Sequence, residues 1–238
     1  MERIATLIQI QCPDYKSLAS CVYNYSYSHQ WCNPIYQGNP IFEELKRKYG
    51  TIPLDRQMII NLFAHGKYYD GFLCALVWGN FCSRLDRNGK VIFESIFDAN
   101  IKIEICDKIN SVIEYLQNQD IENAYRSLDD KKKNGIDGIG QSFFTKLLYF
   151  AGSTVNNLSL QPLIFDDIMA NVYKNILTIL DVIAEHKTGY PYYETYLKRM
   201  DELARLLKLN TTGHVEALLF SPDIKKILAD EAQNKLTK

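Results

Sequence analysis

Apolar side chains recur along most of this chain at the three- and four-residue spacing of an amphipathic helix. The segments 163–186 and 192–210 keep that spacing for longer than a strand extends. Glycine and proline separate the shorter segments with the same pattern, which are 42–50, 55–66, 71–85, 99–118, 120–130 and 208–235. The pattern therefore predicts a protein built mainly from α-helices.

Strand-like patterns are short and isolated. The segments 5–12 and 90–97 are the candidates, and neither has a hairpin partner. The aromatic segment 23–40 is marked by glycine and proline and is expected to form a loop, although it is too hydrophobic to be disordered. No internal repeat or low-complexity tract interrupts the predicted helical globule.

The length and the charge limit the possible partners. The 238 residues can bury a core as one large domain or as two smaller ones that share a cleft. The 27 Lys and Arg against 28 Asp and Glu give a net charge of -1, so any basic surface must be local. The N-terminus shows no basic leader, and no run of eighteen apolar residues occurs. We expect a cytoplasmic monomer with no membrane partner.

The cysteines and histidines give no metal-binding pattern. The six cysteines are irregularly spaced, none falls after Cys106, and we expect free thiols in a reducing compartment. This distribution excludes a C-terminal iron–sulfur loop. His65, His186 and His214 have no ligand spacing and are interpreted as surface or capping residues, so no cofactor is expected.

The sequence DGIGQSFFTKLLYF, residues 137–150, places two glycines directly before a helical pattern. Gly138 and Gly140 permit a positive φ and bring backbone N–H groups within reach of a phosphate, and the following helix start adds a favourable dipole. Lys131, Lys132 and Lys133 lie just upstream and provide local positive charge. The competing interpretation is a glycine-rich helical corner beside a solvated lysine run.

A second motif follows about two dozen residues later. In QPLIFDDIMANVYKN, a proline and an apolar triplet precede Asp166 and Asp167 at the start of an amphipathic helix. The ordered pair IDGIGQSFFTKLLYFAG and PLIFDDIMANV resembles the helix-hairpin-helix DNA glycosylase superfamily, and is most similar to bacterial 8-oxoguanine DNA glycosylase-like proteins. The resemblance covers residues 120–180. It implies a helix-hairpin-helix glycosylase-like helical globule with a cleft between two helical parts.

The resemblance also implies an organisation and a set of DNA contacts. Residues 1–238 are expected to form a single glycosylase-like unit, with the helix-hairpin-helix at 120–150 and the helix that carries the catalytic aspartate at 162–186. The DNA-binding residues are expected around the hairpin, where the carbonyl of Ile139 corresponds to a position that often holds a monovalent cation. These residues are Gly138, Ile139, Gly140, Gln141, Ser142 and Lys131 to Lys133.

The resemblance assigns catalysis to Asp166, with Asp167 as the next candidate. A carboxylate in a partly desolvated cleft stabilises the positive charge that develops on the sugar and can orient the attacking water. Asp166 also suits an ordinary helix N-cap, and one aspartate can serve both purposes. Ser142 stands where bifunctional relatives carry an amine nucleophile, which favours hydrolysis without strand cleavage.

Lys146 lies one helical turn beyond Ser142, on the same face. It is interpreted as a displaced amine or a phosphate clamp. Alternatively, it extends its ammonium group from an otherwise buried helix or pairs with a carboxylate.

A glycosylase must hold the flipped base, commonly between aromatic faces. Trp31 and His29 in the aromatic segment are the leading candidates, with Tyr27 and Tyr36, whereas the apolar neighbourhood of Trp78 favours core packing. The substrate is expected to be an oxidised purine, or a bulky base such as glucosylated hydroxymethylcytosine in phage DNA. Two other classes stay open, a non-catalytic DNA-binding module and a helical interaction protein.

Overall fold

The computed structural model describes the chain in five stretches, which are residues 1–81, 102–129, 135–136, 138–181 and 188–237. These residues form twelve α-helices and two short 3-10 helices, and they contain no strand. The prediction of a mainly α-helical protein is confirmed. None of the helices described is long and apolar enough to cross a membrane.

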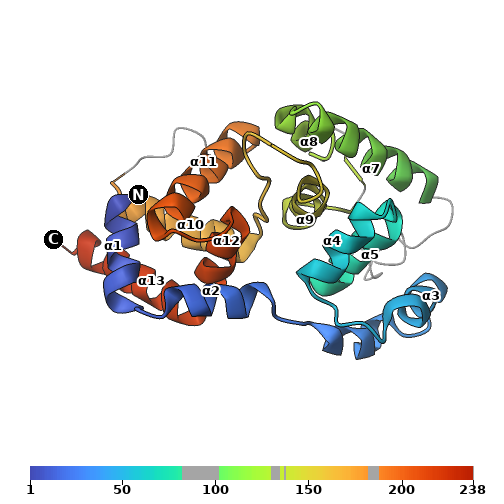
Figure 1. The fold of residues 1–238 in the computed structure, drawn as a ribbon, viewed down its shortest axis with the longest axis horizontal. Helices are drawn as coiled ribbons and strands as arrows, with labels where there is room; N and C mark the ends of the chain where they lie inside the picture. Colours follow the sequence, from blue (N-terminus) through green and yellow to red (C-terminus); the bar gives the residue numbers. More distant parts are fainter. Residues whose placement is uncertain (82–101, 130–134, 137, 182–187, 238) are drawn as a thin grey trace. The chain divides into compact units, whose positions relative to one another are not determined.

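Contacts between Cα atoms divide the chain into two compact units. Unit 1 combines Met1–Asn24 with Ser159–Lys238, and unit 2 is the continuous segment Tyr25–Leu158. Both chain ends therefore belong to unit 1, near α1 and α13 (Figure 1). Two helical parts within one glycosylase-like unit were expected from the sequence, and the contacts define two helical units.

The described residues of unit 1 form six helices, which are α1 (Glu2–Gln11), α2 (Tyr15–Tyr23), α10 (Asp167–Ile179), α11 (Tyr190–Leu207), α12 (Thr212–Phe220) and α13 (Pro222–Leu236). The short helix α12 has contacts with α2, α10, α11 and α13. Five consecutive residues of α12, Val215 to Leu219, are buried, including Glu216 and Leu218. A helix that is apolar on nearly all sides requires such a central place.

Helix α1 replaces one of the predicted strands. The segment 5–12 alternates apolar and polar residues, but Ile4 and Ile8 lie one turn apart and are fully buried. Ile10, which completed the strand-like alternation, is 73% exposed. Packing of α1 against α11 and α13 therefore overrides the local pattern. The other candidate strand, 90–97, lies outside the described residues.

The described residues of unit 2 form six α-helices and the two 3-10 helices. They are η1 (Ser28–Cys32), η2 (Pro34–Tyr36), α3 (Pro40–Tyr49), α4 (Arg56–Ala64), α5 (Tyr68–Trp78), α7 (Lys102–Gln117), α8 (Ile121–Arg126) and α9 (Gln141–Gly152). Helix α9 packs against α4, α5, α7 and α8, so it forms the centre of this unit (Figure 1). Every residue of α9 from Phe144 to Gly152 is buried, as its continuous apolar sequence requires.

The aromatic segment 23–40 is an ordered connection. Its two 3-10 helices are held by the backbone bond from Tyr27 N to Leu54 O, 2.7 Å, and by the bond from Leu54 N to Ser28 Oγ, 3.0 Å. Asn33 caps η2 by accepting from Ile35 N. Buried aromatic rings and caps thus order this segment without a long helix.

The described cysteines are all free thiols, which are Cys12, Cys21, Cys32, Cys74 and Cys106. Burial raises the pKa of the Cys74 thiol well above its ordinary value. Free thiols were expected from the irregular spacing, and Cys82 lies outside the described residues.

Candidate functional site

The hairpin of unit 2 begins with a tight turn. Ile139 N donates to Ile136 O at 3.0 Å and closes a four-residue turn whose third residue is Gly138. Gly138 has a φ of 77°, in the left-handed region that glycine adopts at little cost. The side chains of Ile136 and Ile139 are each 1% exposed and anchor the turn in the core. The sequence predicted this use of glycine.

Helix α9 starts directly after the turn. Gly140 is its N-cap with extended backbone, and this residue makes no side-chain bond to the first N–H groups of the helix. A helix start of this kind suits an anion, because the orphan N–H groups and the helix dipole both favour negative charge. Gln141 Nε2 donates to Tyr125 Oη at 2.9 Å and fixes the start of α9 to α8.

Further predicted contacts of the hairpin involve the carbonyl of Ile139 and the three lysines that precede it in the sequence. No backbone N–H of a described residue donates to the carbonyl of Ile139. The cation role that the resemblance implies for this oxygen stays a prediction. Lys131, Lys132 and Lys133 lie outside the described residues. No group of His, Cys, Asp and Glu that could hold a metal ion occurs in the described part of the chain.

Lys146 is buried within unit 2, with only 4% of its surface exposed. Its Nζ donates to Ser142 O at 2.8 Å and lies 5.0 Å from the ring centroid of Phe143. A side-chain carbon at Gly79 would come within 2.6 Å of Lys146 Cε, so the glycine leaves room for the lysine stem. The side chain thus turns back along α9 to position 142.

The four predicted base-pocket residues separate into two pairs. The rings of Tyr27 and His29 lie 6.0 Å apart, with Tyr27 half-buried and His29 exposed. Trp31 and Tyr36 are 2% and 0% exposed and pack against Phe42 of α3. Their burial leaves little ring surface for a base, which argues against direct stacking on Trp31 or Tyr36.

Trp78 takes a more open position than its apolar sequence suggested. It is half-buried and its ring lies 5.4 Å from that of Tyr27 in an edge-to-face arrangement. The guanidinium of Arg56 lies 5.0 Å from the Trp78 ring centroid and 5.1 Å from that of Tyr149. Arg56 was not predicted from the sequence, although a cation at the start of the apolar helix RQMIINLFA was a signal for it.

The predicted catalytic aspartate is in unit 1. Asp166 is half-buried and is the N-cap of α10, where its Oδ1 accepts from Met169 N at 2.9 Å. Asp167, the second candidate, is exposed in the first turn. The predicted helix 162–186 in fact begins at Asp167 and, as described, ends at Ile179, because Asp166 caps it after an extended segment. Partial burial favours Asp166 as the group that stabilises charge on a sugar.

The histidines occupy ordinary positions. His65 is exposed at the end of α4 and its Nδ1 lies 2.7 Å from Asn61 O. His214 lies in the first turn of α12 and stacks on Tyr23 with ring centroids 4.2 Å apart. His186 lies outside the described residues. None of these positions supports a catalytic assignment.

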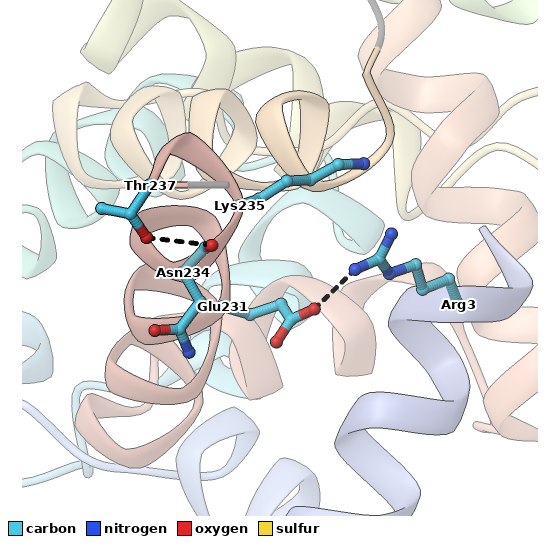
Figure 2. A pocket seen from close by; sticks show the side chains of 5 residues that line it. All are labelled: Arg3, Glu231, Asn234, Lys235 and Thr237. Carbon is cyan, nitrogen blue, oxygen red and sulfur yellow. Dashed lines mark hydrogen bonds and ion pairs between the residues drawn. The ribbon is translucent and has the colours of Figure 1, made fainter.

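A surface hollow of about 630 Å³ lies elsewhere in unit 1, between α1 and the end of α13 (Figure 2). Arg3 and Glu231 form an ion pair at 2.7 Å on its wall, and Thr237 Oγ1 donates to Asn234 O at 3.1 Å. Lys235, also in the lining, donates to Ile179 O at 2.8 Å. None of the predicted site residues lines this hollow, and its Arg3 and Lys235 side chains join α13 to α1 and to the end of α10.

A glycine turn precedes a buried helix, and an aspartate caps a later helix. These two motifs follow the order seen in helix-hairpin-helix DNA glycosylases. A family model described as "Putative 8-oxoguanine DNA glycosylase OGG-like protein" matches residues 23–220. The chain belongs to this family, and the resemblance noted in the sequence is confirmed. Comparisons with curated proteins and with solved structures returned no match.

Proposed function

We propose that this protein is a DNA glycosylase that hydrolyses the N-glycosidic bond of a modified base flipped out of DNA and leaves an abasic site. The observation that carries the proposal is Asp166, a half-buried carboxylate at the start of α10. The family match covers this residue and the hairpin. Cleavage of the bond develops positive charge on the sugar, which a carboxylate stabilises while it orients water.

The second role of Asp166 as a helix cap is compatible with this chemistry. Its Oδ1 accepts from Met169 N, and a carboxylate has two oxygens and several lone pairs. The cap holds the side chain in one orientation, which favours catalysis because the group needs little reorganisation. Asp167 is retained as the second candidate.

DNA would be held through its phosphates. The start of α9, with Gly140 as its N-cap, offers backbone N–H groups after the Gly138 turn, and Lys131 to Lys133 add positive charge nearby in the sequence. A monovalent cation at the Ile139 carbonyl would add a further phosphate contact. We propose no other cofactor and a monomeric, cytoplasmic enzyme.

We further propose that the enzyme is monofunctional. Ser142 stands where bifunctional relatives carry lysine, and the Lys146 nitrogen is bonded to the backbone of α9. One observation favours a second candidate, an amine mechanism. The 2.8 Å contact with Ser142 O turns the Lys146 side chain back toward the residue where relatives carry the amine. Capture of a covalent adduct separates the two mechanisms.

The substrate class has two candidates. Family membership favours an oxidised purine and a role in repair. The polar and aromatic groups of Tyr25, Tyr27 and His29 are partly or largely exposed and suit a larger base with a sugar, such as glucosylated hydroxymethylcytosine in phage DNA. That substrate would make the protein a defence enzyme.

The test is an abasic-site assay. The protein is incubated with duplexes that carry 8-oxoguanine, hydroxymethylcytosine or glucosylated hydroxymethylcytosine, and the products are cleaved with alkali. The proposal expects strand breaks with one class of modified duplex and none with unmodified DNA. DNA binding without release of any base would support the alternative of a non-catalytic helix-hairpin-helix protein.

A further inference from the structure

The chain directly before Asp166 is a buried extended segment. Residues 162–165 have no regular secondary structure, and all four are buried. The described residues include no strand that could pair with them. Buried backbone N–H and C=O groups require hydrogen-bond partners, so other groups must replace the ladder of a sheet.

Tyr193 of α11 supplies both partners of Leu163. Its hydroxyl donates to Leu163 O at 2.7 Å and accepts from Leu163 N at 3.0 Å. One side chain thus pairs with Leu163 as the backbone of a neighbouring strand would. Tyr193 is 0% exposed, and such bonds are hard to exchange for water in a dry core.

Tyr196 and Glu216 do the same for Ile164. The Tyr196 hydroxyl donates to Ile164 O at 3.0 Å, and Glu216 Oε2 accepts from Ile164 N at 3.3 Å. Both side chains are 0% exposed. Side chains from α11 and α12 therefore bond all four backbone polar groups of two consecutive residues.

We propose that Tyr193, Tyr196 and Glu216, here called the backbone clamp, are positioning residues that hold Asp166 in its catalytic place. This inference rests on the proposed function of Asp166. Only Phe165 lies between the clamped residues and Asp166, and its ring packs 4.6 Å from that of Tyr196. The clamp fixes the backbone directly before Asp166, and the bond from Met169 N fixes the Asp166 carboxylate.

The clamp should act on the chemical step rather than on DNA binding. A shift of about 1 Å in a reacting group can cost about 100-fold in rate. Loss of the clamp hydroxyls should therefore lower kcat, while KM for DNA, set by other residues, should change little. A role limited to folding would lower the yield of active protein and leave kcat per folded molecule unchanged.

The experiment compares three conservative variants in the full chain. Tyr193→Phe removes the bonds to Leu163, and Tyr196→Phe removes the bond to Ile164. Tyr173→Phe is the matched control, because Tyr173 belongs to the same aromatic cluster and its buried hydroxyl has no hydrogen-bond partner among the described residues. We expect kcat to fall about 10-fold or more in the first two variants, with KM within about threefold. The control should keep both values.

Hydrogen exchange at the Met169 amide gives a readout that needs no activity. This N–H is bonded to Asp166, so a loosened clamp should speed its exchange in Tyr193→Phe and Tyr196→Phe but not in Tyr173→Phe. Glu216→Gln keeps an acceptor oxygen for Ile164 N and should retain kcat within about threefold. If Glu216→Gln lost as much kcat as Tyr193→Phe, this result would contradict the acceptor role of Glu216.

The outcomes separate the clamp from the proposed function. If Asp166→Asn abolishes base release while both tyrosine variants keep kcat and Met169 protection, the clamp is wrong and the function stands. If Asp166→Asn is fully active, the catalytic assignment of Asp166 is wrong. The clamp is wrong as well if exchange of the Met169 amide is also unchanged in the two tyrosine variants. Should Tyr193→Phe fail to fold, Tyr196→Phe still decides.

Discussion

The side-chain nitrogen of Lys146 lies 2.8 Å from the carbonyl oxygen of Ser142, one turn before its own place in α9. The buried stem of Lys146 passes Gly79, where a side chain would collide with it. Bifunctional relatives carry a lysine where this chain has Ser142, and Lys146 is the lysine nearest to that position in the sequence. The identity of the nucleophile is therefore tested first.

Borohydride trapping during base release should give no covalent protein–DNA adduct with the wild-type protein. Water assisted by Asp166 leaves an intact abasic strand, whereas an amine nucleophile passes through a Schiff base that borohydride reduces. Strand breaks should appear only after alkali. Ser142→Lys restores the amine of bifunctional relatives and serves as the positive control. An adduct that is lost in Lys146→Gln would establish Lys146 as the nucleophile.

Gly138→Ala should destabilise the protein by about 1 to 2 kcal/mol, because alanine must then adopt the left-handed φ of 77°. It should also weaken DNA binding by displacing the start of α9. Urea unfolding and fluorescence anisotropy measure the two effects. Gly140→Ala is the control, since its φ of −80° is ordinary for any residue. Equal losses in both variants would show that the turn conformation is not the cause.

Neutralising Lys131, Lys132 and Lys133 together should weaken binding to all DNA sequences alike. Each lost phosphate contact should reduce the dependence of log K on log salt by about 0.9. Affinities measured from low to moderate salt for modified and unmodified duplexes give this slope. An unchanged slope would place the phosphate-binding surface on other residues.

Alkaline pH should destabilise the protein, and Tyr173→Phe should reduce this effect. Burial raises the pKa of Tyr173 to about 12, above the value near 10 of an unfolded tyrosine. Between those values the unfolded state loses the proton first, so stability is present below pH 10 and falls as the pH rises toward 12. Urea unfolding from pH 8 to 11 measures the decline. An equal decline in the variant would contradict this role of Tyr173.

The sequence predicted those parts of the fold that depend on local chemistry. The glycine turn, the buried helix after it and the aspartate cap each follow from the properties of a few adjacent residues, such as the φ of Gly138. The strand predicted at 5–12 was wrong because tertiary packing decided the outcome. Ile4 and Ile8 face α11 and α13, and the alternation between Ile8 and Ile10 carried no structural information.

Other site features could not be predicted, because they join residues distant in the sequence. The bonds of Tyr193 and Glu216 to the segment before Asp166 span 30 and 52 residues. A glutamate within HVEALLF is unusual for an apolar helix, and this was the one local sign of its buried role. Trp31 resembles an exposed stacking residue in sequence, yet Phe42 of the following helix covers it.

The central claim is that Asp166 assists base release, and single-turnover kinetics of Asp166→Asn test it most directly. The variant keeps a side-chain acceptor for Met169 N, so the α10 cap and the fold should persist, and DNA affinity should stay near that of the wild type. Asp167→Asn, at an exposed position, is the matched control. We expect a loss of at least about 100-fold in the rate of base release for Asp166→Asn and a near wild-type rate for Asp167→Asn. A wild-type rate in Asp166→Asn, or a loss confined to Asp167→Asn, would show that Asp166 does not assist base release.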